Sequence, residues 1–134
     1  MNERTLICVI DDDDLMRQTI GRILREAGYD VIDTKDGDAG ITAIERASPK
    51  LLITDIIMPN REGIETIREV KRRFPAIPIV AISGGGRLGP DGFLELALKL
   101  GADDCLAKPF RPADLLDKVA FFLNAQNRTQ TAFV

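Results

Sequence analysis

Five side chains with charged or reactive groups follow short apolar runs of the chain. They are Asp11, Asp12, Asp55, Ser83 and Lys108. A carboxylate can act as a nucleophile, while a hydroxyl and an ammonium group can contact the oxygens of a phosphoryl group. Together with a bound cation, these side-chain types indicate a site for phosphoryl transfer. The five residues can act together only if the fold brings them to one place.

The three acidic residues of this set would repel one another if the strands that carry them are neighbours. Two like charges about 4 Å apart interact with roughly 4 kcal/mol at an effective dielectric constant of 20. Such a cluster either binds protons or takes up a cation. The chain has no histidine, and no cysteine stands next to these acids. The ligands would therefore be oxygen atoms, and the ion that fits is Mg²⁺ with several water ligands.

Each of these residues, taken singly, also has an ordinary structural interpretation. An aspartate after a strand is commonly a helix N-cap or a turn residue, and we assign Asp13 and Asp14 to that role. Asp55 differs because the apolar residues 56–58 follow it, where a solvated turn carboxylate is not expected. A serine before glycines is usually a turn residue, and a single lysine is usually on the surface. The functional interpretation therefore depends on the whole set.

Strand-like runs alternate with helical patterns five times along the chain. The predicted strands are Leu6–Ile10, Asp30–Thr34, Leu51–Thr54, Ile79–Ile82 and Asp104–Ala107, and the predicted helices are Leu15–Ala27, Gly37–Ala47, Glu62–Phe74, Asp91–Leu100 and Pro112–Leu123. This alternation indicates right-handed parallel crossovers, and hence a doubly wound α/β domain with helices on both faces of the sheet. Ligands of such sheets bind beyond the carboxyl ends of the strands, where the five side chains would lie.

The composition of the strands predicts their positions within the sheet. The runs 6–10, 51–54 and 79–82 are almost wholly apolar, which suits the centre of a parallel sheet that is covered on both faces. The more polar run 30–34 suits an edge. Between the fourth strand and the next helix, the glycine-rich segment from Ser83 to Pro90 is a predicted loop.

The overall composition is that of one globular domain. The chain has 134 residues, of which 45% are hydrophobic and 29% are charged, enough for a single core. We expect the domain to cover residues 1–124 and the polar residues 125–134 to form a frayed tail. With a net charge of −3 and no basic patch, nothing indicates direct binding to nucleic acid or a membrane. The longest apolar run, 6–10, is too short for a signal or spanning segment, so we expect a cytoplasmic protein.

The set of five residues resembles that of the response regulator receiver domains of two-component signalling. The resemblance covers about residues 5–124 and is carried by the acidic pair Asp11-Asp12, by Asp55 in the sequence TDIIMP, by Ser83, and by Lys108 in the sequence KPF. It implies a flavodoxin-like fold with a five-stranded parallel sheet in the order 2-1-3-4-5. It also implies a phosphorylation-dependent switch that catalyses only its own phosphorylation and dephosphorylation.

The resemblance further implies a role for each acidic residue. Asp55 would accept a phosphoryl group from a histidine kinase or a histidine phosphotransfer protein. Mg²⁺ would be held by Asp12, Asp55 and the carbonyl group of Ile57, and Asp11 would act mainly through a bound water molecule.

The hydroxyl and the ammonium group would respond to phosphorylation. By the same resemblance, Lys108 would pair with the phosphoryl group and Ser83 would move toward it as the switch. The peptide bond between Lys108 and Pro109 is expected to be cis. Phosphorylation adds charge and acceptor oxygens at this end of the sheet, so the loop after the fourth strand is the expected bistable element.

The sequence departs from the family pattern at two places. Cys105 stands where the family usually has an aromatic residue, which leaves coupling through that position in question. The loop Gly84–Gly89 is a few residues longer than usual. Ile57 and Gly85 lack the polar groups that could orient a hydrolytic water molecule, so we expect slow loss of the phosphoryl group.

Cys8 and Cys105 both lie in apolar runs and are expected to be buried, inert thiols.

The predicted helix Asp91–Leu100 is apolar almost all round. It is either packed deeply in the core or it presents an apolar patch to a downstream protein or a second copy of the chain. In the receiver family the face formed by the fourth helix, fifth strand and fifth helix often serves that purpose. If the chain is a stand-alone protein and not a fragment of a longer one, we expect output by direct contact.

Two other functions remain open from the sequence. The chain could be a pseudo-receiver that uses the same fold only for binding, as Cys105 and the long loop would allow. Alternatively, the run Asp11-Asp12-Asp13 after an apolar strand resembles the haloacid-dehalogenase-type phosphatases, in which Asp11 would be the nucleophile. The second alternative leaves Asp55 without a role.

Overall fold

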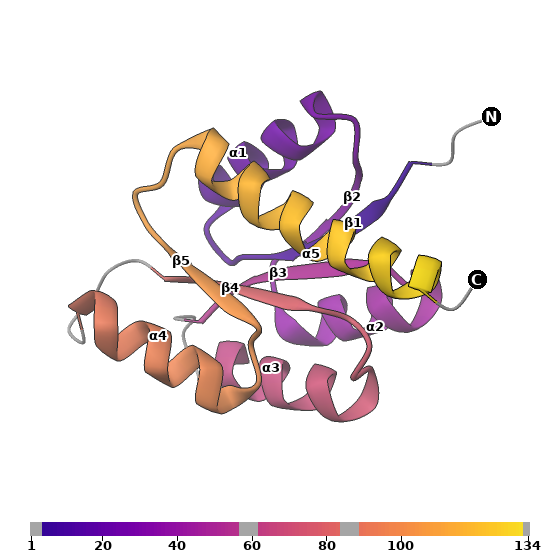
Figure 1. The fold of residues 1–134 in the computed structure, drawn as a ribbon. Coiled ribbons are helices and arrows are strands. Elements are labelled where there is room, and N and C mark those ends of the chain that lie inside the picture. The colour runs from indigo at the N-terminus through magenta and orange to yellow at the C-terminus, as the bar shows by residue number, and fades with distance from the viewer. Residues whose placement is uncertain (1–3, 57–61, 84–88, 133–134) are drawn as a thin grey trace.

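Five parallel strands alternate with five helices in the computed structural model of the protein (Figure 1). The structure describes residues 4–56, 62–83 and 89–132, apart from the side chains of 62, 89–94 and 126–132. In chain order the elements are β1 (Leu6–Ile10), α1 (Asp14–Glu26), β2 (Asp30–Thr34), α2 (Gly37–Ala47), β3 (Leu51–Asp55), α3 (Glu62–Arg73), β4 (Ile79–Ser83), α4 (Gly89–Leu100), β5 (Asp104–Ala107) and α5 (Pro112–Ala132). The predicted alternation of strands and helices is confirmed.

The strands form one parallel sheet in the order β2-β1-β3-β4-β5. This is the order that the resemblance implied, and it places the polar strand β2 at an edge and the apolar strands β1, β3 and β4 in the centre. All five carboxyl ends lie at the same end of the sheet, toward the left of Figure 1. Within the described parts of the chain, no helix combines the length and the apolarity needed to cross a bilayer.

Two hydrophobic clusters hold the helices on opposite faces of the sheet. Alternate strand residues such as Ile7 and Ile53 pack with Leu24 of α1 and Leu115 of α5. The neighbours that point the other way, such as Leu52, pack with helices α2, α3 and α4. Figure 1 shows α1 and α5 above the sheet and the other three helices below it. Burying one such side chain contributes about 1.5–3 kcal/mol, so the strands that carry the charged residues are anchored on both faces.

Polar caps define where the helices next to the strand ends begin. The Asp13 carboxylate accepts a hydrogen bond from the Met16 N–H at the start of α1, as predicted, and Asp14 lies in the first turn. At the start of α5, the Arg111 N–H donates to the Asp114 carboxylate at 3.1 Å. Each cap satisfies a backbone donor that the helix leaves open, and thereby fixes the direction in which the chain leaves the strand.

Two helix ends differ from the predictions by more than one residue. Helix α5 continues from the predicted end at Leu123 to Ala132, because residues 124–132 contain neither glycine nor proline to stop it. Helix α4 begins at Gly89, within the segment predicted as a loop. The limit of the domain at residue 124 stays a prediction.

The two cysteines are both free but differ in burial. Cys8 is fully buried in the sheet, whereas Cys105 on β5 is only half-buried. The expectation of two buried thiols is therefore correct for Cys8 and wrong for Cys105, because β5 is an edge strand with partial cover. Burial, and to a lesser extent the charge of Asp33, raises the pKa of Cys8 to about 12.

Candidate functional site

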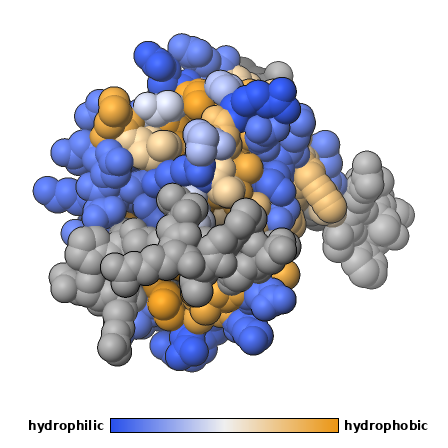
Figure 2. All heavy atoms as spheres, turned by 90° about the vertical axis from the view of Figure 1, so that its left-hand side faces the viewer, coloured by the Kyte–Doolittle hydropathy of each residue, from blue (hydrophilic) through white to orange (hydrophobic). Residues whose placement is uncertain are grey.

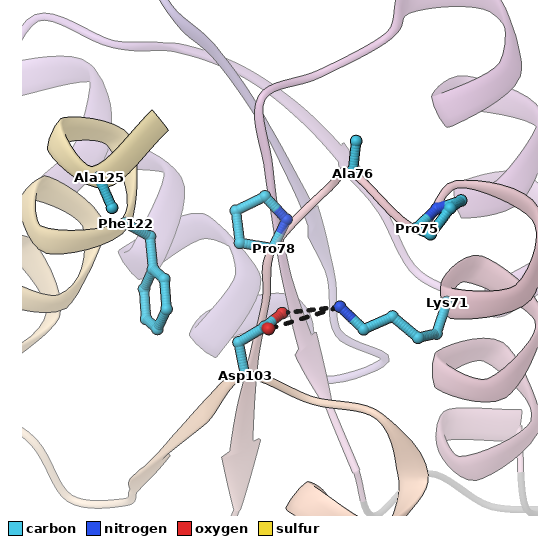
Figure 3. A pocket seen from close by; sticks show the side chains of 7 residues that line it. All are labelled: Lys71, Pro75, Ala76, Pro78, Asp103, Phe122 and Ala125. Carbon is cyan, nitrogen blue, oxygen red and sulfur yellow. Dashed lines mark hydrogen bonds and ion pairs between the residues drawn. The ribbon is translucent and has the colours of Figure 1, made fainter. Parts of the chain in front are cut away.

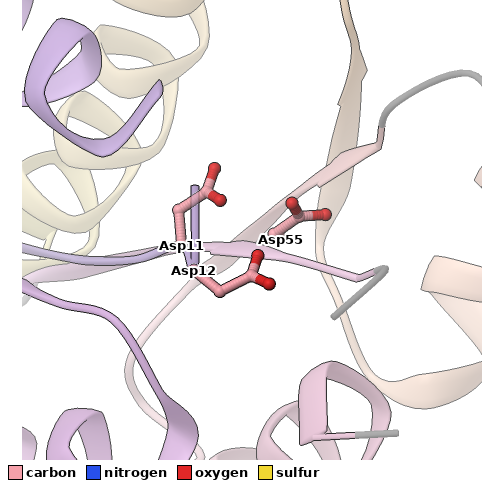
Figure 4. A group of neighbouring side chains, drawn as sticks. All are labelled: Asp11, Asp12 and Asp55. Carbon is pink, nitrogen blue, oxygen red and sulfur yellow. The ribbon is translucent and has the colours of Figure 1, made fainter. Parts of the chain in front are cut away.

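Three carboxylates meet at the carboxyl end of the sheet. Asp11 and Asp12 follow β1, and Asp55 is the last residue of the neighbouring strand β3. One oxygen of each carboxylate lies within 4.8 Å of those of the other two. Figure 4 shows Asp12 and Asp55 directing their carboxylates into the same region, with Asp11 to one side. Asp11 and Asp55 are buried and Asp12 is exposed, so the cluster opens to solvent on the Asp12 side.

Lys108 brings a positive charge into this cluster. Its Nζ lies 3.2 Å from Asp55 Oδ2 and 3.3 Å from Asp11 Oδ2. The Lys108 side chain is only 16% exposed. Partial burial alone would lower the pKa of Lys108, but the charges of Asp55 and Asp11, and its hydrogen bonds to both, outweigh burial and raise the pKa above its ordinary value. The ammonium group is therefore charged and offsets part of the repulsion between the two buried carboxylates.

Asp11 is held on every side by hydrogen bonds. Its N–H donates to the Thr34 carbonyl of β2 at 3.1 Å, and its Oδ1 accepts from the Asp13 N–H at 3.0 Å. Its carbonyl oxygen accepts from Arg17 Nη1 at 2.9 Å. With Oδ2 paired to Lys108, both carboxylate oxygens of Asp11 have a partner. Asp11 is thus a rigid part of the site.

Asp55 is positioned by β3 and by the start of α3. Its neighbour in β4 is Ile82, whose carbonyl accepts from the Ile56 N–H at 3.0 Å. Gly63 of α3 lies so close behind this corner that a Cβ atom there would stand 2.6 Å from the Asp55 carbonyl oxygen and would also meet that of Ile56. Only glycine permits this approach without a backbone shift, because real Cβ contacts are longer.

Ser83 ends β4 beside the cluster and is fully buried. Its carbonyl oxygen accepts from the Lys108 N–H at 2.7 Å, so the hydroxyl-bearing and ammonium-bearing strand ends are joined directly. The Lys108-Pro109 bond is cis, as predicted.

The donor set of the cluster fits a hard divalent cation. The described ligands are carboxylate oxygens, and no thiolate or imidazole takes part in the group. Three carboxylates against one ammonium leave net negative charge at a place open to water, which matches the preference of Mg²⁺ for a few carboxylates and several waters.

Several predicted positions lie outside the described residues. They are the Ile57 carbonyl, Gly85 and the loop 84–88. The structure therefore brings together Asp11, Asp12, Asp55 and Lys108, with Ser83 adjoining, and leaves Ile57 as a prediction. Figure 2 views the molecule from this end and shows hydrophilic and hydrophobic side chains side by side on this face.

Two residues of the site were not identified from the sequence. Arg17 donates to the Asp11 carbonyl oxygen, and Gly63 lies where a Cβ atom would meet the Asp55 carbonyl oxygen. The available signals were weak: Arg17 stands three residues after Asp14 on one helix face, and Gly63 stands within the first helical turn after Asp55. An arginine or a glycine near the start of a helix also occurs where the helix has no part in a functional site.

A hollow of about 200 Å³ lies at the opposite end of the sheet, between the starts of β4 and β5 (Figure 3). Its two charged residues, Lys71 and Asp103, form an ion pair at 3.1 Å. Asp103 also accepts from the Ile79 N–H at 2.8 Å. Both groups therefore serve to connect α3 with β4 and β5, and the hollow takes no part in the acidic site.

The fold and the cluster define a doubly wound α/β domain with an acidic site at its carboxyl-end edge. A family model described as the response regulator receiver domain matches residues 7–120. The chain belongs to this family, the receiver domains of two-component systems.

Individual relatives agree with this assignment. The chain is 30% identical over 123 residues to the alkaline phosphatase synthesis transcriptional regulatory protein PhoP of Bacillus subtilis (strain 168), covering 92% of this chain and 49% of that protein. It thus spans about half the length of this relative. A CheY-like receiver domain protein from Methanospirillum hungatei JF-1 is 28% identical with a TM-score of 0.85, covering 95% of this chain and 99% of the other. A receiver domain protein from Clostridium thermocellum is 29% identical with a TM-score of 0.83, covering 93% and 98%.

Proposed function

We propose that the chain is a signalling switch that accepts a phosphoryl group on Asp55 from a histidine kinase or a histidine phosphotransfer protein. The observation that carries the proposal is the pairing of Lys108 Nζ with Asp55 Oδ2 at 3.2 Å beside Asp11 and Asp12. A nucleophilic carboxylate, a fixed ammonium group and an acidic cluster that fits Mg²⁺ are the parts that phosphoryl transfer needs.

In the transfer step, an Asp55 carboxylate oxygen attacks the phosphorus atom of a phosphohistidine. An oxygen–phosphorus bond forms, and the nitrogen–phosphorus bond breaks, with its electron pair returning to the imidazole ring, which takes up a proton. The ammonium group of Lys108 is fixed where negative charge collects on the phosphoryl oxygens. It needs no large reorganisation to stabilise that charge, because it already lies against Asp55.

Mg²⁺ would be held by Asp12, Asp55 and the Ile57 carbonyl, with Asp11 bound through water. When bound, the ion supplies positive charge that neutralises the transferred phosphoryl group. The protein contributes a fixed Asp11, which is held by its hydrogen bonds to Asp13, Thr34 and Lys108.

Phosphorylation would redistribute the contacts of Lys108. In the present state the ammonium group is shared between Asp11 and Asp55. A phosphoryl group on Asp55 carries more charge than the carboxylate and offers more acceptor oxygens. Lys108 therefore turns toward it, and the buried Ser83 hydroxyl moves to the same oxygens. Because Lys108 is joined to Ser83 through its N–H, both strand ends respond together.

The test is exposure of the chain to Mg²⁺ and a small phosphodonor, followed by intact-mass measurement. We expect one added phosphoryl group on the wild type, none on Asp55→Asn, and strongly reduced labelling when Mg²⁺ is chelated. An unmodified wild type in the presence of Mg²⁺ would favour a pseudo-receiver that acts only by binding.

The phosphatase alternative depends on Asp11 as the nucleophile. Both carboxylate oxygens of Asp11 have partners, in Asp13 and Lys108, and its side chain is 1% exposed. This geometry favours a supporting role for Asp11. Turnover of small phosphomonoesters that is abolished by Asp11→Asn and retained in Asp55→Asn would reverse the assignment.

Output would pass through the face formed by α4, β5 and α5. The described part of α4 buries Ala97 and Leu100 but leaves Leu98 48% exposed, and Phe121 of α5 is 57% exposed. Both expected features of this helix, core packing and exposed apolar surface, are therefore present. A partner or a second copy that covers this face would bind phosphorylated wild type more tightly than phosphorylated Leu98→Glu. Slow loss of the phosphoryl group, argued from Ile57 and Gly85, stays a prediction for the same preparation.

A further inference from the structure

The guanidinium group of Arg17 contacts three residues beside the acidic cluster: Asp11 after β1, Asp14 of its own helix, and Asp33 of β2. Its Nη1 donates to the Asp11 carbonyl oxygen at 2.9 Å, and its Nη2 donates to Asp14 Oδ1 at 2.7 Å. Its Nε lies 3.6 Å from Asp33 Oδ1 on β2. Although Arg17 belongs to the first turn of α1, its side chain is only 14% exposed. A mostly covered arginine with three acidic or carbonyl partners is held in one orientation.

The contact with Asp11 falls where the sheet no longer fixes the backbone. The register between β1 and its neighbours ends at Ile10, one residue before Asp11. The Asp11 N–H still bonds to Thr34, but the carbonyl oxygen that begins the Asp11–Asp12 peptide bond is held by Arg17. Asp12 is exposed, so packing does little to place it. The direction of its carboxylate depends on that peptide bond.

We infer that Arg17 is a positioning residue for cation binding, because it orients the peptide bond that aims Asp12 at the space shared with Asp55. The inference rests on the proposed function and extends it to a residue that touches neither the phosphoryl group nor the ion. Partners of this kind set the orientation of metal ligands, and their loss typically lowers metal affinity by about 10–100-fold.

The sign of the effect separates positioning from charge. Arg17 carries a positive charge near an expected cation site. If charge alone mattered, its removal would strengthen binding of Mg²⁺. If Arg17 positions Asp12, removal weakens binding in spite of the lost charge. The Arg17→Lys variant keeps the charge but cannot reach three partners with one planar group, so it also weakens binding.

The test is a titration with Mg²⁺ at constant ionic strength, followed by the backbone amide resonances of the site in an NMR spectrum that also reports folding. We expect Arg17→Met and Arg17→Lys to lower the affinity about tenfold, at the lower end of the range for such partners. The matched control is Arg25→Met, which removes the same charge from the same helix. Arg25 also pairs with Asp33, at 3.4 Å, but it has no contact with Asp11. The Mg²⁺ affinity of Arg25→Met should stay within about twofold of that of the wild type.

Each outcome decides the inference. Wild-type affinity in both Arg17 variants overturns it, as does tighter binding in Arg17→Met with unchanged binding in Arg17→Lys. An equal loss in Arg25→Met overturns it too, because the effect would then belong to the helix as a whole. If Arg17→Met does not fold, Arg17→Lys decides alone. Failure of the wild type to bind Mg²⁺ would refute the proposed function and the inference together, whereas equal affinities refute only the inference.

Discussion

Replacement of Lys108 by methionine tests the electrostatics of the acidic cluster most simply. The substitution shortens the side chain by one atom and removes the charge that lies 3.2 Å from Asp55 and 3.3 Å from Asp11. At an effective dielectric constant of 20, each contact corresponds to about 5 kcal/mol of Coulomb attraction. Desolvation of the three groups offsets most of this gain, and breaking a buried pair typically costs about 3–5 kcal/mol. Because Lys108 keeps some contact with water, we expect the free energy of unfolding to fall by about 3 kcal/mol.

The assay is urea unfolding followed by circular dichroism, at neutral pH with the divalent cations chelated. Lys118→Met is the matched control, because Lys118 pairs with Asp104 at 2.7 Å while both side chains are about one-third exposed. An exposed pair contributes at most about 1 kcal/mol. A loss of less than about 1 kcal/mol in Lys108→Met, or an equal loss in both variants, would refute this account of the cluster.

The stability difference between the wild type and Lys108→Met should depend on pH and on Mg²⁺. The pKa of Lys108 is raised in the folded protein, so its stabilising effect is fully present below the unfolded-state pKa of about 10.4. It is lost as the pH rises through the higher folded-state value. The difference between wild type and Lys108→Met should therefore be constant at neutral pH and shrink above about pH 10.4. Added Mg²⁺ should stabilise Lys108→Met more than the wild type, because the ion no longer competes with the ammonium group.

Three further perturbations follow from the geometry. Asp12→Asn should raise the free energy of unfolding in the absence of Mg²⁺ by up to about 1 kcal/mol, because it relieves the repulsion between carboxylates. It should also weaken Mg²⁺ binding, because it removes a ligand. A lower free energy of unfolding in the presence of chelator would contradict this prediction. Gly63→Ala should lower the free energy of unfolding by about 1–3 kcal/mol and slow the labelling of Asp55 by a phosphodonor. The reason is that the added Cβ atom would stand 2.6 Å from the Asp55 carbonyl oxygen. Wild-type behaviour in both assays would show that α3 does not pack tightly against Asp55. A thiol reagent at pH 8 should modify Cys105 slowly and leave Cys8 intact until the protein unfolds. Burial, and to a lesser extent the charge of Asp33, raises the pKa of Cys8 to about 12. Two modified thiols in the native protein, detected by intact-mass measurement, would contradict the burial of Cys8.

The sequence predicted the element order and the positions of the strand-end residues well, for a physical reason. Strands buried on both faces read as continuous apolar runs, and parallel strands separated by helices carry their carboxyl ends to one edge. Asp11, Asp55 and Lys108 are therefore brought to the same end of the sheet, where the long Lys108 side chain reaches both carboxylates. The cap at Asp13 was equally readable, because an N-cap depends on local backbone geometry.

What could not be predicted depends on distances between elements. The contact of Arg17 with the Asp11 carbonyl requires the angle at which α1 leaves the sheet, and a surface arginine has the same sequence signature. The approach of Gly63 to Asp55 requires the depth at which α3 packs. The half-burial of Cys105 follows from incomplete cover of an edge strand, which an apolar run does not reveal.

The site of phosphorylation tests the central claim most directly. The chain would be treated with a small phosphodonor and Mg²⁺, reduced with borohydride to convert an aspartyl phosphate into homoserine, and mapped by peptide mass spectrometry. We expect homoserine at position 55 alone, because Asp55 faces Lys108 while both carboxylate oxygens of the buried Asp11 are engaged by Asp13 and Lys108. Homoserine at position 11, or at no position in a protein that binds Mg²⁺, would contradict it.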